Sequence, residues 1–225
     1  MGVQNFRLSK QLILTLRSAL FLIFSVSIVT ACVGGGGGGG GGNSSPILEG
    51  YFIDSPVDGI EYTNSSGTGG TTGNKGEFQY KEGDTVTFSV GGIVIGSVAG
   101  NKFITPTDLK GLSNDGILNV VRLLLTLDED KNPDNGITIT AAVLSKAQNL
   151  TASTDNFNST DFESSDLAIF AKQANDDNRP LVNLETAKTH LVETEKDLAD
   201  GQYDGPTDTD GDGIRDEVDE SPPVC

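Results

Sequence analysis

The sequence predicts an α+β fold, in which a small β-sandwich is followed by a few packed helices. Residues 85–90 alternate apolar and polar side chains, which is the pattern of a half-buried strand. Between residues 117 and 127, apolar side chains instead recur at i, i+3, i+4, i+7 and i+10, the spacing of one helix face. Residues 201–225 show neither period and are rich in acidic side chains, so an irregular tail is expected there.

The chain begins with features of a signal peptide over residues 1–31. Three cationic residues precede an apolar run, 19–29, that is interrupted only by two serines. This run is shorter than the about 20 residues that cross a bilayer. The stretch Val29-Thr30-Ala31-Cys32 then resembles the lipobox of bacterial lipoproteins. The resemblance implies cleavage before Cys32 and acylation of that cysteine, and the alternative is an N-terminal transmembrane anchor.

Residues 32–46 are expected to form a tether that carries the lipidated cysteine. Nine consecutive glycines, Gly34 to Gly42, favour no ordered structure because glycine loses the most backbone entropy on ordering. Val33 stands where lipoproteins retained in the inner membrane carry aspartate. The resemblance therefore implies a lipid-anchored protein of the outer membrane, on its periplasmic face or at the cell surface.

Residues 47–105 read as a β-sandwich-like module of short strands separated by glycine-rich turns. The segment 50–60, GYFIDSPVDGI, and the segment 73–78, GNKGEF, resemble the carboxypeptidase-regulatory or transthyretin-like module. The resemblance implies a structural or binding unit, not a catalyst. Residues 63–76 are expected to be a long polar loop.

Residues 106–200 are expected to be a helical segment. The helix through 117–127 can be capped by Asn114 or Asp115. Two further helices are expected near 167–174, capped by Ser164 or Ser165, and near 184–198. The only histidine, His190, lies on the last helix, and a lone histidine there is expected to be a surface or packing residue.

An oxygen-rich turn follows the first helix. Asp128, Asp130 and Asn132 lie two residues apart and can offer oxygen ligands to a cation. The alternative is a helix stop followed by acidic turn residues. The spacing therefore suggests a possible second cation site, besides the one expected in the tail.

The acidic tail carries the chemistry that the sequence indicates most clearly. Gly213 occupies position 6 of a twelve-residue loop, where the chain must turn sharply. The pattern resembles a single thrombospondin type 3 repeat, and the alternative is a disordered acidic tail. The spacing predicts a Ca²⁺ site in this loop. Five ligands are side-chain carboxylates, and the ligand at position 7 is the backbone carbonyl of Ile214. The predicted ligand residues are Asp208, Asp210, Asp212, Ile214, Asp216 and Asp219.

Composition limits the function further. A net charge of -17 disfavours nucleic acid as a partner. One histidine and no nucleophile motif favour a protein that is not an enzyme. We expect a calcium-binding lipoprotein, attached to the membrane by its lipid anchor, with a structural or adhesive role. The alternative is a carbohydrate- or polymer-binding module, which would need exposed aromatic side chains. The sequence identifies no protein or glycan partner.

Overall fold

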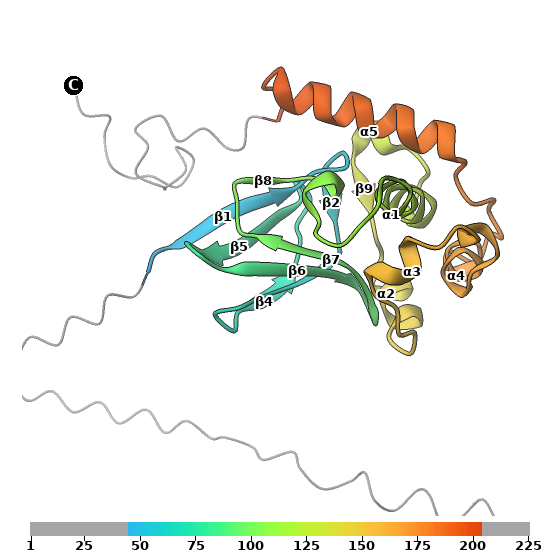
Figure 1. Cartoon of the computed structure of the whole chain (residues 1–225), viewed down its shortest axis with the longest axis horizontal. Coiled ribbons are helices and arrows are strands. Elements are labelled where there is room, and N and C mark those ends of the chain that lie inside the picture. Colours follow the sequence, from blue (N-terminus) through green and yellow to red (C-terminus); the bar gives the residue numbers. More distant parts are fainter. Residues whose placement is uncertain (1–44, 204–225) are drawn as a thin grey trace, which may run out of the picture. The chain divides into compact units, whose positions relative to one another are not determined.

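The computed structural model describes residues 45–203, and these form the expected α+β fold, with strands first and helices after them (Figure 1). The strands are β1 (Ile47–Phe52), β2 (Val57–Asp58), β3 (Glu61–Asn64), β4 (Gly69–Thr71), β5 (Glu77–Lys81), β6 (Thr85–Val90), β7 (Ile93–Ala99), β8 (Phe103–Ile104) and β9 (Ile137–Thr138). The helices are α1 (Asn114–Leu127), α2 (Ala141–Ala147), α3 (Thr154–Phe157), α4 (Asp166–Gln173) and α5 (Leu184–Ala199). Short 3-10 turns occupy Pro106–Asp108, Pro133–Asn135 and Phe162–Ser164.

Two main sheets give the β region its sandwich-like arrangement. One has the strand order β5-β1-β8, with β5 antiparallel and β8 parallel to β1. The other is antiparallel and has the order β4-β3-β6-β7. In β6 the expected alternation is confirmed, because Val86, Phe88 and Val90 are fully buried. Strand β4 lies inside the segment 63–76 that the sequence predicts as a loop.

Helix α1 packs at the centre of the helical part. Its N-cap is Ser113, whose Oγ accepts a hydrogen bond from the Gly116 N–H at 3.0 Å. The predicted caps, Asn114 and Asp115, are instead the first two residues of the helix. Leu123, Leu124 and Leu127 of α1 are fully buried and Leu125 is 7% exposed, so this helix places a continuous apolar surface in the core.

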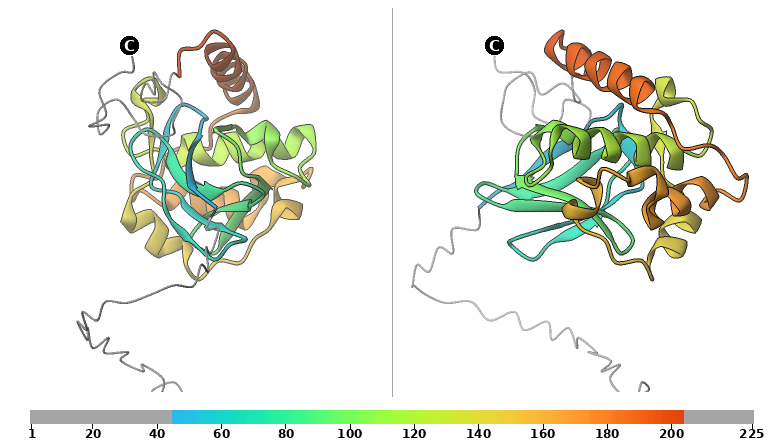
Figure 2. Two further views of the ribbon diagram at one scale, coloured as in Figure 1. Left: turned by 90° about the vertical axis from the view of Figure 1, so that its left-hand side faces the viewer. Right: turned by 45° about the vertical axis from the view of Figure 1, so that its right-hand side comes forward.

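The sheets and the helices share one hydrophobic core within the described residues. Phe52 and Phe88 come from the two sheets, Leu123 from α1 and Phe157 from α3, and all four belong to the same buried cluster. Helix α5 packs along α1 on the outside of the helical part (Figures 1 and 2). Its buried apolar side chains are Ala187 and Leu191, whereas Leu184, expected on the same face, is 46% exposed.

A third, two-stranded sheet ties the helical part back to the β region. Strand β9 pairs in parallel with β2, and the Ile137 N–H donates to the Pro56 carbonyl at 2.9 Å. This pairing places the loop after α1, residues 128–136, beside the turn at 53–56. The two segments lie far apart in the sequence, yet they form the walls of the sites described below.

Candidate cation site

The candidate site is the loop between α1 and β9, and Asp128 is its innermost residue. The Asp128 side chain lies just after the last turn of α1 and is 1% exposed. Its Oδ1 accepts a hydrogen bond from the Thr138 N–H at 2.9 Å. Its Oδ2 is buried and has no hydrogen-bond partner among the residues that the structure describes. A buried carboxylate oxygen left in this state is costly unless a proton or a cation neutralises it.

Asp130 shapes the same loop from its exposed side. Its Oδ1 accepts from the Asn132 N–H at 2.9 Å and its Oδ2 from the Asn135 side-chain amide at 2.8 Å. These hydrogen bonds lower the pKa of Asp130, so its carboxylate stays charged. Lys131, which follows Asp130, adopts a positive φ of 65°, so the chain turns between Asp130 and Asn132.

The electrostatics of Asp128 differ from those of Asp130. Burial raises the pKa of Asp128, and the nearby charge of Asp130 raises it further. The backbone N–H groups of Thr138 and Asn132 act in the opposite direction and hold it down. Two carboxylates this close, one of them buried, favour either a shared proton or a bound cation. Asn132 meets Asp130 through its backbone N–H, and no contact of its side-chain oxygen with either carboxylate is seen among the described residues, so the ligand set Asp128, Asp130 and Asn132 stays a prediction.

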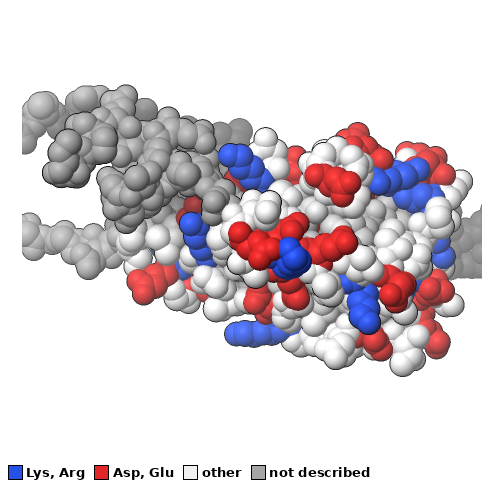
Figure 3. Space-filling view, turned by 90° about the horizontal axis from the view of Figure 1, so that it is seen from above, with Lys and Arg blue, Asp and Glu red and all other residues white. Residues whose placement is uncertain are grey.

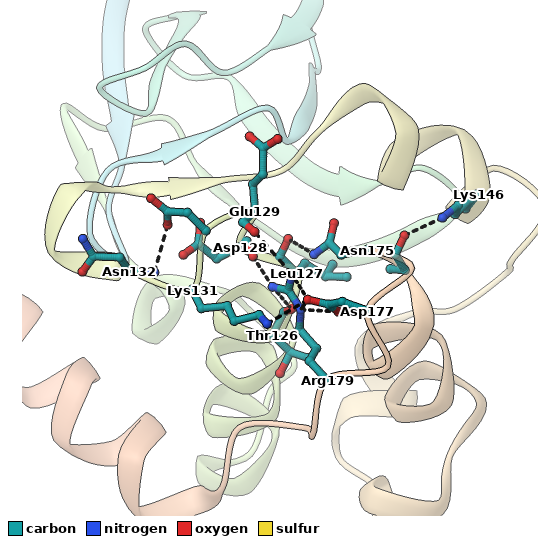
Figure 4. A network of polar contacts seen from close by, with 12 residues as sticks. Thr126, Leu127, Asp128, Glu129, Lys131, Asn132, Lys146, Asn175, Asp177 and Arg179 are labelled. Carbon is teal, nitrogen blue, oxygen red and sulfur yellow. Dashed lines mark hydrogen bonds and ion pairs between the residues drawn. The ribbon is translucent and has the colours of Figure 1, made fainter.

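The closest lysine does not neutralise the pair. Lys131 Nζ turns toward Asp177 and forms an ion pair with its Oδ2 at 2.8 Å (Figure 4). Asp177 also receives the Arg179 guanidinium, and these two cations lower the pKa of Asp177 strongly. Lys131 and Arg179 therefore both pair with Asp177, and neither forms an ion pair with the Asp128 carboxylate among the described residues.

Residues 175–179 hold the end of α1 in place, a role that the sequence did not reveal. Arg179 is 7% exposed and donates to the carbonyls of Thr126, Asp128 and Glu129. The Asn175 side-chain amide donates to the Leu127 carbonyl at 2.9 Å. The last carbonyls of a helix have no partner inside the helix, so this segment satisfies them and places a cation at the negative end of the helix dipole.

The ligand set fits a hard cation that accepts neutral oxygens. Within residues 45–203, no three acidic, histidine or cysteine side chains gather to hold a metal ion. Of the predicted ligands, Asp128 and Asp130 are the two that carry carboxylates, and a cation here would need water or other neutral oxygens to complete its coordination. Calcium accepts carboxylate, amide and water oxygens in flexible geometry, whereas zinc would need nitrogen or sulfur ligands.

The other predicted site residues lie outside the described residues. These are the lipid-attachment residue Cys32 and the tail ligands Asp208, Asp210, Asp212, Ile214, Asp216 and Asp219. In the part of the chain that is described, no helix is both long and apolar enough to cross a membrane.

The exposure of the tyrosine side chains is relevant to the alternative prediction of a carbohydrate-binding module. Tyr51, Tyr62 and Tyr80 are all buried, with 5–8% exposure, and belong to the core or its edge. Among the tyrosines, only Tyr203 remains partly open. Stacking of a sugar on an exposed tyrosine surface would therefore depend on Tyr203.

Comparison with protein-family models, with curated proteins and with solved structures finds no match to this chain.

His190 forms a second polar centre, and it packs against the β region. Its Nε2 lies 3.1 Å from the Asp54 carbonyl oxygen and 3.4 Å from Asp54 Oδ1. Asp54 is fully buried, and burial raises the pKa of its carboxyl despite the opposing effect of His190. The pKa of His190 is also raised, because the interactions with Asp54 outweigh the effect of burial, which is the largest single cause and lowers it.

The contact between His190 and Asp54 predicts that the free energy of unfolding falls as the pH rises, because the contact joins α5 to the β region. The folded-state pKa of His190 lies above 6.5, so its contribution is fully present below pH 6.5 and is lost as pH rises through the raised value. The raised pKa of Asp54 acts in the same direction. In urea unfolding, wild type should lose stability relative to His190→Gln as the pH rises above 6.5. A difference that grows with pH would contradict the assignment.

Proposed function

We propose that this protein is a lipid-anchored protein of the outer membrane whose folded part binds calcium and serves a structural or adhesive role. One observation carries the calcium proposal for the folded part: the buried Asp128 Oδ2, without a hydrogen-bond partner among the described residues, next to the charged Asp130. The spacing of acids in the tail, residues 208–219, supports calcium binding independently.

Calcium suits the loop better than the alternatives. A bare helix stop does not require a buried carboxylate oxygen without a hydrogen-bond partner, so the environment of Asp128 supports a neutralising partner, either a cation or a proton shared with Asp130. Magnesium demands near-ideal octahedral geometry and keeps its water, whereas calcium accepts irregular sets of oxygens. Extracellular calcium modules work at affinities of about 10⁻⁴–10⁻³ M, which suits a site with two carboxylates.

Asp128→Asn tests the site in the folded part. Asparagine keeps an oxygen for the Thr138 N–H and removes the buried charge, so in chelator the variant should be at least as stable as wild type. Calcium at ten times its dissociation constant should stabilise wild type by about 1.4 kcal/mol and should not stabilise the variant through this loop. Thermal unfolding with calcium and with chelator measures both effects.

The comparison needs a background without the tail site, so both proteins should carry Asp210→Ala and Asp212→Ala. Glu129→Gln is the matched control, because Glu129 neighbours Asp128 and its side chain is exposed. It should retain the full calcium response. The proposal fails if Asp128→Asn responds to calcium as strongly as Glu129→Gln does.

Cys32→Ser tests the anchor. Without the thiol no lipid can be attached, and the variant expressed in a Gram-negative host should leave the membrane fraction. The motive is the apolar run 19–29 followed by Val29-Thr30-Ala31-Cys32. Fractionation with metabolic labelling by palmitate measures the effect. A variant that stays membrane-bound and uncleaved would identify the N-terminus as a transmembrane anchor instead.

A further inference from the structure

Two adjoining hollows lie between α5 and the β region, and the larger one borders the loop that carries the candidate cation site. The smaller, of about 120 Å³, is lined by aromatic residues that include Tyr51 and Phe103. The larger, of about 380 Å³, is lined by polar and acidic residues of α5 and of the loop before β9. Pro56 and Tyr203 belong to both walls, so the two hollows join there. We call them together the α5 groove.

The larger hollow is negatively charged. Glu193, Asp197 and Asp134 line it, and none of the described residues that line it is a lysine or an arginine. The face of the molecule that carries α5 shows several groups of acidic side chains, with lysines and arginines between them (Figure 3). Glu193 and Asp197 stand one helical turn apart, where like charges destabilise a helix. The pair therefore gains from a cation placed between them.

Asp54 adds a buried charge behind this wall. It is 0% exposed, and neither carboxylate oxygen has a hydrogen-bond partner among the described residues. Asp54 does not line the hollow itself, but His190, which does, places its Nε2 3.4 Å from Asp54 Oδ1. Its charge also raises the pKa of the Tyr203 phenol, after burial and Asp197. Of the described residues that line the larger hollow, His190 is the only one that can carry a positive charge, whereas Lys75 lines the smaller hollow beside it.

The smaller hollow offers the opposite chemistry. The rings of Tyr51 and Phe103 lie 5.8 Å apart at a tilt of 35°, and Ile53 and Tyr203 line the hollow beside them. The polar residues Lys75 and Gln202 line its rim, and Lys102 lies over the Phe103 ring, 5.5 Å from its centroid. Aromatic walls of this kind bind ring or aliphatic bodies, and aromatic faces also attract cations. The groove thus combines an apolar end with an acidic end.

We propose that the α5 groove binds a small ligand in which a primary ammonium group is attached to a ring body, with the ring at the aromatic end and the ammonium at Glu193 and Asp197. An ammonium supplies three donors and one positive charge. A volume of about 380 Å³ exceeds what a single metal ion needs and falls in the range of small-molecule sites. The chain beyond Tyr203 is acidic, so like charge disfavours that segment as the occupant.

Two probe pairs test the charge requirement on the full chain, in chelator so that calcium does not compete. Phenethylamine is compared with N-acetylphenethylamine, and a glucosamine hexamer with the N-acetylglucosamine hexamer. Calorimetry should show at least one amine binding, and roughly tenfold weaker binding of its acetylated counterpart, because the loss of both charge contacts together is worth about 1.4 kcal/mol. Binding by phenethylamine alone identifies an aryl-alkylamine site, and binding by the hexamer alone an amino-sugar site.

Variants assign the binding to the groove. Glu193→Gln with Asp197→Asn should weaken amine binding roughly tenfold, because both carboxylates are lost. Glu195→Gln is the matched control on the same helix, since Glu195 is exposed and lines neither hollow. It should bind as wild type does. The inference is overturned if neither amine binds, if the acetylated probes bind equally well, or if the control weakens binding as much as the double variant.

Discussion

Arg179→Met is expected to lower the free energy of unfolding by about 3–5 kcal/mol, the cost of removing one partner from a buried charged network. The Arg179 guanidinium donates to the carbonyls of Thr126, Asp128 and Glu129 at the end of α1. Methionine fills a similar volume but donates no hydrogen bond, so buried carbonyls would be left unsatisfied. Urea unfolding followed by circular dichroism measures the change.

Lys131→Met is the matched control for this variant. Lys131 also pairs with Asp177, but its side chain is 56% exposed, and among the described residues the carbonyls at the end of α1 accept from Arg179 and not from Lys131. An exposed ion pair contributes about 0–1 kcal/mol. Equal losses in the two variants would mean that the ion pair with Asp177, and not the capping of α1, is what Arg179 contributes.

Arg122→Met is expected to cost about 2–4 kcal/mol, because it leaves more than one buried acceptor without a donor. Arg122 is 2% exposed and lies inside α1. Its Nε donates to the Val182 carbonyl at 2.6 Å and one terminal nitrogen to Asn119 Oδ1 at 3.0 Å. The residue therefore joins α1 to the segment that leads into α5.

The third partner of Arg122 is Glu163, and a variant of Glu163 tests how much the ion pair contributes apart from the buried hydrogen bonds. The other terminal nitrogen binds Glu163 Oε1 at 2.6 Å, but the Glu163 side chain is 73% exposed. Glu163→Gln should therefore cost less than about 1 kcal/mol. If Glu163→Gln destabilises the protein as much as Arg122→Met does in the same urea series, the ion pair and not the buried carbonyl contact holds this region.

The sequence predicted those helices and strands in which apolar residues recur regularly along the whole element. Strand β6 and helix α1 are examples, because each buries one regular face that can be read without knowledge of its neighbours. Strand β9 could not be predicted, since two residues have no readable period and their pairing partner lies about 80 residues earlier, in β2. Likewise, Ser113 caps α1 although the residues after it are equally good caps.

For the candidate cation site too, the sequence predicted some features, and others depend on tertiary packing. Spacing alone selected Asp128, Asp130 and Asn132, because alternate oxygens in a turn converge on one point. Burial of Asp128 and the use of Asp130 to bind Asn132 and Asn135 depend on how the loop packs, which no local pattern records. Arg179 and the contact of His190 with Asp54 join segments more than 50 residues apart. Such contacts are set by tertiary packing.

Calcium retained per chain in equilibrium dialysis tests the central claim most directly. At millimolar calcium, wild type should retain an ion at the loop and another at the tail, given affinities of about 10⁻⁴–10⁻³ M. Asp128→Asn with Asp130→Asn should remove one, and Asp210→Ala with Asp212→Ala the other. Wild type that retains no calcium, or a loop variant that retains as much as wild type, would contradict the account.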